Sequence, residues 1–148
     1  MASIAVRTNS SFLTSERMAT FARALSAMAE FRQVFGRRLD EPVVAEIWVA
    51  QELGLEMSPR VNEPGFDLID PTGVRYQVKY RSINTQNVDV NNFDFDYLVL
   101  VNLDEDYRLT GMWCITVEQA RRIFTPRNKF RKFQATQKKV KATTERIR

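Results

Sequence analysis

The stretch that decides the fold, residues 65–82, reads GFDLIDPTGVRYQVKYRS. Its middle, Asp70-Pro71-Thr72-Gly73, predicts a tight turn, because proline presets φ and glycine tolerates the positive φ that closes many turns. Apolar and polar residues alternate on both sides of this turn, as they do in strands with one buried face. We therefore expect a β-hairpin.

Alternation assigns each side chain of this hairpin to a face. If the pairing is centred on Thr72, Asp67 faces Gln77 directly, and Lys79 lies one step further along the same face. Arg75 and Arg81 share that polar face. The expected apolar face carries Phe66, Leu68, Tyr76, Val78 and Tyr80.

The polar face combines a carboxylate, an amide and an amine. Carboxylate and amide oxygens are hard ligands that suit Mg²⁺, which usually binds one or two protein carboxylates together with water and phosphate oxygens. A lysine beside such a site can orient an attacking water or neutralise charge on a phosphate. The alternative is an ordinary amphipathic hairpin whose polar face is solvated.

Composition limits the class of protein. A chain of 148 residues with 44% hydrophobic content is the size of one domain with its own core. The sequence contains no histidine, which excludes Ser-His-Asp and Cys-His catalysis and His-ligated zinc. Its one cysteine, Cys114, excludes an intrachain disulfide, and its apolar neighbours predict a small buried side chain.

The sequence predicts a soluble, cytoplasmic protein. No apolar run approaches the roughly 20 residues of a membrane span, and the first residues lack the apolar core of a signal peptide. A single cysteine also fits a reducing compartment.

Charge is unevenly distributed along the chain. Residues 125–148 hold nine Lys and Arg against Glu145, a net charge of +8, whereas the first 124 residues carry −4. This asymmetry favours a polyanionic partner, and a solubilising tail is the alternative. The candidate nucleic-acid contacts in this segment are Arg127, Lys129, Arg131, Lys132, Lys138 and Lys139.

Two helices are expected before the hairpin. Apolar residues recur at helical spacing over Thr14–Phe35, with Gly36 as the stop. Asp40 and Pro42 predict the start of a second helix, which ends at Gly54. Glu46 is the one acid in the middle of its apolar segment, and an ordinary solvated glutamate is the alternative reading there.

Further strands and two short helices are expected in the chain after the hairpin. The polar segment Asn84–Asn92 predicts a loop, and the apolar block before Val101 predicts a central strand. A further strand is expected over Tyr107–Ile115, and a short helix over Val117–Ile123 capped by Thr116. In the basic tail, Phe130 and Phe133 suggest an edge-like strand with aromatic groups available for stacking. A thin apolar stripe predicts a helix over 135–148, and a disordered tail is the alternative.

With these elements in order, the chain resembles the PD-(D/E)XK nuclease superfamily, the restriction-endonuclease-like fold. That family places an acid on a leading helix, an aspartate on one strand and an acid-x-Lys motif on the next. Here the matching positions are Glu46, Asp67 and Gln77-Val78-Lys79, within residues 40–125. The sequence departs from the pattern in having Gln77 instead of a second carboxylate, and Phe66 instead of proline before Asp67.

The resemblance implies a Mg²⁺-dependent DNA endonuclease, with Mn²⁺ as a substitute metal. Its implied metal ligands are Asp67, Gln77, the Val78 carbonyl and Glu46, while Lys79 would act at the attacking water. Arg81 becomes a further candidate phosphate contact.

We therefore expect an α/β protein with a restriction-endonuclease-like mixed central sheet flanked by helices. Its single domain would comprise an N-terminal arm and helix (1–38), the nuclease-like core (40–125) and a basic C-terminal segment (126–148). Duplex DNA is the expected partner, and a homodimer formed through the helix Thr14–Phe35 is expected from the fold. The alternatives are an inactive nucleic-acid-binding module, motivated by Gln77, and an adaptor whose basic tail binds an acidic protein.

Overall fold

The structure is a computed structural model that describes residues 12–58, 65–82, 86–127 and 132–144. The chain divides into two compact units, 1–39 and 40–148. The first unit contains helix α1 (Ser15–Phe35), and every strand and the other helices described belong to the second.

Both predicted N-terminal helices are confirmed. The side chain of Thr14 caps α1 by accepting the N–H of Arg17, and Gly36 ends it with φ 69°. Helix α2 (Glu41–Leu53) begins after Asp40, whose side chain accepts the N–H of Val43. No residue of α1 is buried, whereas α2 buries one side of its surface.

The centre of the second unit is a mixed sheet with strand order β1-β2-β3-β5-β6. Strands β3 and β5 are parallel and the other pairs are antiparallel, so the mixed α/β class expected from the sequence is confirmed. The central strand is buried on both faces over Leu98–Val101, as the apolar block predicts. The strands are β1 (Glu56–Met57), β2 (Leu68–Ile69), β3 (Arg75–Tyr80), β5 (Tyr97–Leu103) and β6 (Leu109–Thr116).

The hairpin β2–β3 has the predicted register. Leu68 pairs with Tyr76, which centres the hairpin on Thr72. The carboxylate of Asp70 holds the turn by accepting the backbone N–H groups of Thr72 (2.8 Å) and Val74 (2.9 Å). Gly73 has φ 92°, the left-handed conformation that glycine adopts without strain.

A second, three-stranded sheet has the order β4-β8-β7. Its strands are β4 (Asn87–Val90), β7 (Thr125–Arg127) and β8 (Lys132–Thr136). The predicted loop over Asn84–Asn92 is therefore wrong where β4 forms, because Val88 and Val90 alternate with Asp89 and both valines are buried.

The described part of the basic tail is folded. Helix α4 (Gln137–Thr143) follows β7 and β8 and buries Val140. Helix α3 (Val117–Ile123), which precedes β7, has the predicted boundaries and is capped by Thr116. Phe133 packs into the core against Phe93, with ring centroids 4.7 Å apart, so it is not free to stack on a base. The predicted helix over 135–148 begins later, after β8, and residues 145–148 lie outside the described residues.

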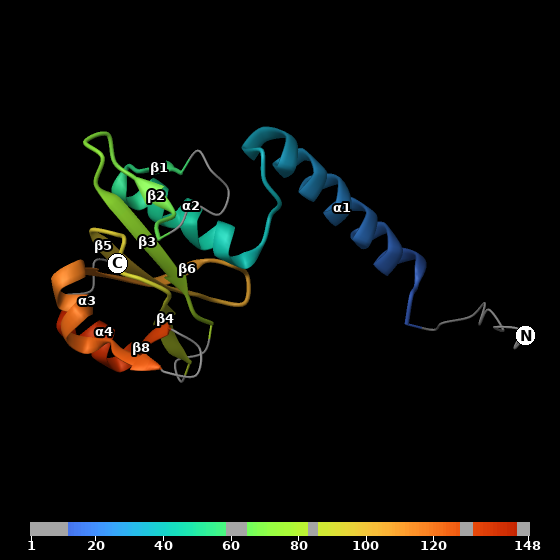
Figure 1. The fold of residues 1–148 in the computed structure, drawn as a ribbon. Helices are drawn as coiled ribbons and strands as arrows, with labels where there is room; N and C mark the ends of the chain where they lie inside the picture. Colours follow the sequence, from blue (N-terminus) through green and yellow to red (C-terminus); the bar gives the residue numbers. More distant parts are fainter. Residues whose placement is uncertain (1–11, 59–64, 83–85, 128–131, 145–148) are drawn as a thin grey trace, which may run out of the picture. The chain divides into compact units, whose positions relative to one another are not determined.

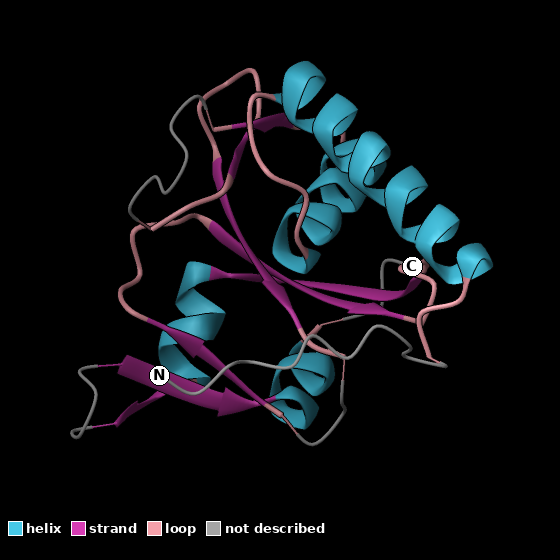
Figure 2. Ribbon diagram, turned by 90° about the vertical axis from the view of Figure 1, so that its right-hand side faces the viewer, coloured by secondary structure: helices cyan, strands magenta, loops and turns pink. Residues whose placement is uncertain are grey.

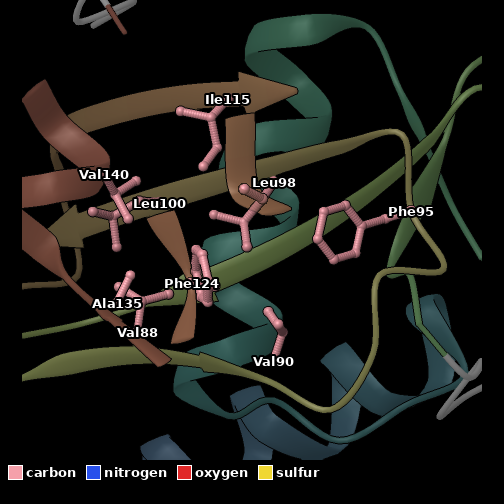
Figure 3. Close-up of a cluster of buried hydrophobic side chains, with 10 residues drawn as sticks. Val88, Val90, Phe95, Leu98, Leu100, Ile115, Phe124, Ala135 and Val140 are labelled. Atoms are coloured by element: carbon pink, nitrogen blue, oxygen red, sulfur yellow. The ribbon is translucent and has the colours of Figure 1, made fainter. Parts of the chain in front are cut away.

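Apolar side chains cover both faces of the five-stranded sheet, whose strands lie between α2 and the pair α3 and α4 (Figure 1). Helix α2 packs on one face, where Leu68, Val78 and Val99 meet Ala45 and Val49. On the other face the small sheet, α3 and α4 enclose a second cluster (Figures 2 and 3). The residues labelled in Figure 3 are Val88, Val90, Phe95, Leu98, Leu100, Ile115, Phe124, Ala135 and Val140.

Among the described residues, no helix has both the length and the apolar character needed to cross a membrane.

Candidate functional site

The carboxylate of Asp67 lies at the centre of the candidate site. Its Oδ2 atom accepts a hydrogen bond of 2.7 Å from Nε2 of Gln77 and one of 2.8 Å from the backbone N–H of Val78. The same Nε2 lies 3.4 Å from the carbonyl oxygen of Val78. The predicted meeting of Asp67 and Gln77 is therefore confirmed, and the Val78 carbonyl joins them.

Asp67 precedes β2, an inner strand of the sheet between β1 and β3, and its backbone bonds to Ser58 on one side and Tyr76 on the other. Strand β2 is regular only over Leu68–Ile69, so the Asp67 carboxylate takes the Val78 N–H that a longer strand would have bonded through its backbone. This break in the strand also corrects one expectation. Phe66 packs against the core opposite Leu68 instead of sharing its face, because the two-residue alternation does not extend back past Asp67.

Lys79 lies next to this group on β3. Val78 and Tyr80 pack against the α2 side of the sheet, so the alternation of the strand directs Gln77 and Lys79 to the other face. Lys79 is half-buried there, beside Leu100 on the neighbouring strand. Its burial lowers the pKa of Lys79, while the negative charges of Asp89 and Asp67 act in the opposite direction. Lys79 and the Asp67 carboxylate are therefore electrostatic neighbours.

Asp89 is a member of this site that the sequence did not predict. It accepts from Arg81 at 2.7 Å and lies 3.6 Å from Nζ of Lys132. It thereby links the end of β3 to the small sheet, with its charge close to Lys79. The alternation Val88-Asp89-Val90 was the available signal, since two buried valines make the residue between them the exposed member of a strand.

Arg81 is held by contacts inside the protein. Its Nε donates to the Asn87 carbonyl (2.7 Å), Nη1 to the Tyr80 carbonyl, and Nη2 to Asp89. The structure thus gives Arg81 a structural role at the β3–β4 junction, which the sequence did not predict.

Glu46 comes from a different side of the sheet. It is half-buried on α2, whose neighbouring residues Ala45 and Val49 pack against the face formed by Leu68 and Val78. The structure therefore brings together Asp67, Gln77, the Val78 carbonyl and Lys79, and it holds Glu46 on the helix that covers the opposite face.

The candidate nucleic-acid contacts are only partly described. Arg127 and Lys132 are exposed and pair with each other across β7 and β8. Lys138 and Lys139 are exposed on α4, whereas Lys129 and Arg131 lie outside the described residues. Nζ of Lys132 lies 3.6 Å from Asp89, whose charge also acts on Lys79, so the end of the β7–β8 pair that carries Arg127 and Lys132 lies near the candidate site.

The oxygen atoms of this group fit a hard cation. Asp67 offers a carboxylate, Val78 a carbonyl, and Gln77 an amide whose nitrogen lies between them. The two ends of an amide are nearly the same size, so a half-turn of the Gln77 amide exchanges its donor for an acceptor oxygen. The set is one carboxylate and two neutral oxygens, suited to Mg²⁺ that keeps several waters. In the part of the chain that the structure describes, no cluster of three or more Asp, Glu, Cys or His that could hold a metal is found.

Comparisons with known proteins add no family to this geometry. Neither the protein-family models nor the curated proteins contain a match to the chain.

Proposed function

We propose that the protein is a Mg²⁺-dependent DNA endonuclease of the restriction-endonuclease-like fold. The observation that carries this proposal is the convergence of Asp67, Gln77 and the Val78 carbonyl at the start of β2, with Lys79 next on β3. The order of helix, hairpin, central strand and helix around them also supports it.

Asp67, Gln77 and Val78 would hold the cation, whereas Glu46 lies on the helix that covers the opposite face. When bound, Mg²⁺ would supply charge stabilisation at the scissile phosphate and a more acidic bound water. The reaction is hydrolysis: water adds to phosphorus, one P–O bond breaks, and the leaving oxygen takes a proton.

Lys79 would act on the attacking water. A lysine whose pKa is lowered by burial exchanges protons nearer neutral pH than an exposed one, and while charged it neutralises a phosphate oxygen. Asp89 would act through Lys79, because its negative charge opposes the lowering of the Lys79 pKa by burial.

The exposed cations of the C-terminal segment would bind the DNA backbone. Arg127 and Lys132 support this role because they are exposed neighbours at one end of the β7–β8 pair, and Nζ of Lys132 lies 3.6 Å from Asp89. Such contacts are sensitive to salt, since each neutralised phosphate releases bound counterions. Affinity for duplex DNA should therefore fall steeply between 50 and 200 mM salt, on the order of 10-fold or more for a few contacts.

Plasmid cleavage in Mg²⁺, Mn²⁺ or EDTA tests the proposal. We expect the wild type to cut only with metal and Lys79→Ala to lose at least about 100-fold in rate, the size of one acid–base or electrostatic group. Arg108→Ala removes one exposed positive charge elsewhere and should cut normally. Equal cleavage by Lys79→Ala and wild type would reject the assignment.

A nucleic-acid-binding module without catalysis is the second candidate. It is favoured by the bond from Gln77 to Asp67, which satisfies the carboxylate without any cation. This candidate predicts salt-sensitive DNA binding with no cutting in either metal. An absence of DNA binding at low salt would exclude both functions and favour an adaptor that binds an acidic protein.

A further inference from the structure

Helix α1 carries large side chains at alternating spacings of three and four residues. This is the heptad pattern of helices that pack along a common seam. The polar side of the helix follows the same period, since Glu16, Arg23 and Glu30 are seven residues apart. The seam positions are Met18, Phe21, Leu25, Met28, Arg32 and Phe35.

This seam is exposed. Phe21 is 55% accessible, Leu25 49% and Met28 45%, and no residue of α1 is buried. Helices gain most of their stability in proteins from packing an apolar face. The helix is capped at both ends, and the described residues of the unit 1–39, taken by themselves, bury no residue of this seam.

We propose that the seam of α1 packs against α1 of a second copy of the chain, with the two helices antiparallel. The spacing is self-complementary about a two-fold axis between Ser26 and Ala27. In this arrangement Leu25 lies opposite the partner's Met28, and Met18 lies opposite the partner's Phe35.

Arg32 decides the direction of the pairing. Parallel helices would place the two Arg32 side chains against each other inside the seam, where like charges repel. Antiparallel helices place Arg32 against the partner's Phe21, an aromatic face that attracts a guanidinium.

The residues that flank the seam also fit this packing. Ala22, Ala24 and Ala29 are small, so the two helices can approach closely. Antiparallel pairing brings Ala24 near the partner's Phe31, so a large side chain meets a small one. A helix of 21 residues is about 31 Å long, which gives the seam about three heptads.

The test is the mass of the full-length protein in solution, measured by sedimentation over a range of concentrations. We expect a dimer for wild type and a monomer for Leu25→Glu, which places a carboxylate opposite the partner's Met28. Ala27→Glu, on the outer side of the helix, is the matched control and should remain dimeric. A wild-type monomer at all concentrations, including one in which α1 folds back on its own chain, would overturn the proposal.

A second pair of measurements tests the direction. Phe21→Glu puts a carboxylate opposite the partner's Arg32 only in the antiparallel arrangement, so it should weaken the dimer less than Leu25→Glu does. Spin labels on Glu16→Cys should be about 31 Å apart along the helix axis if the helices are antiparallel. Labels about 10–15 Å apart would instead indicate parallel helices and reject the model. DNA cleavage enters neither measurement, so this inference and the proposed function fail separately.

Discussion

The two faces of strand β3 differ in what they contribute. On the α2 side, Val78 packs with Leu68 and Val99 in a cluster of apolar side chains. On the other side, Gln77 bonds to the Asp67 carboxylate, whose charge also acts on Lys79. Alternate residues of this short strand thus have different roles: Val78 packs in the core, whereas Gln77 and Lys79 belong to the candidate site.

Two ionisable side chains make this difference measurable. Burial raises the pKa of Cys114, which packs beside the α2 cluster, to about 11. Burial likewise opposes the charged form of Lys79, but there Asp89 and Asp67 act against the effect of burial. On the α2 side burial therefore keeps the Cys114 thiol protonated and unreactive, whereas on the other side two carboxylates oppose the effect of burial on the pKa of Lys79.

The largest effect should come from the α2 face. Leu68→Ala removes a fully buried side chain and should cost about 2–5 kcal/mol of unfolding free energy. Denaturant titration measures it. The folded fraction of this variant should still cut DNA, and a loss of cutting per folded molecule would break the division between the faces.

The same face should suppress thiol chemistry. Thiolate is the reactive form of cysteine, and a pKa raised from 9.0 to about 11 lowers its fraction at pH 8 about 100-fold. Alkylation of Cys114 should be slower than that of the unfolded chain by that factor and rise about tenfold per pH unit up to pH 11. Equal rates in folded and urea-unfolded protein would contradict the assignment.

The sign of the linked stability follows from the same pKa. The folded protein holds the Cys114 proton more tightly than the unfolded chain, so this stabilisation is complete below pH 9. It is lost as the pH rises from 9 towards 11, because the unfolded chain ionises first. Cys114→Ala should remove this part of the alkaline loss.

Local signals in the sequence predicted the ends of three helices and the register of the hairpin that forms the candidate site. Caps and glycines set the ends of α1, α2 and α3, because these signals act within one helical turn. The register of β2–β3 followed from Asp70–Gly73 alone. The contact between Asp67 and Gln77 was predictable for the same reason.

Long-range contacts were not predictable in this way. The sequence placed Arg81 on the polar face, but its partner Asp89 lies on β4. The polar residues on either side of β4 made this segment look like a loop. The side of the sheet on which α2 packs depends on how the whole unit assembles, and it decides how Glu46 stands relative to Lys79. No local sequence pattern predicts the contact of Arg81 with Asp89 or the face on which α2 packs.

Removing the charge at Lys79 should have a smaller effect of opposite sign. Since burial lowers the pKa of Lys79, its charged form is less stable in the folded protein than in the unfolded chain. Lys79→Met should therefore unfold at a higher temperature than wild type at pH 7, with less change than Leu68→Ala. The difference should shrink as the pH rises towards 10.5, where the unfolded lysine also loses its proton. A melting temperature below wild type would mean that the two aspartates outweigh burial.

The smallest effect, and the most informative about the metal, should come from Gln77→Glu. This change replaces the amide that donates to Asp67 by a second carboxylate, so two like charges meet at the start of β2. Without metal we expect a loss of about 1 kcal/mol, the size of one hydrogen bond. With Mg²⁺ the same pair becomes a stronger ligand set, and a concentration ten times the dissociation constant would return about 1.4 kcal/mol.

Melting temperatures in EDTA and in Mg²⁺ measure this reversal without any assay of activity. Gln51→Glu, an exposed position on α2, is the matched control and should respond to neither condition. If Mg²⁺ fails to stabilise Gln77→Glu more than wild type, the oxygen atoms around Asp67 do not form a cation site. The polar face of β3 would then have only a structural role, in which Asp67 accepts hydrogen bonds from Gln77 and from the backbone N–H of Val78.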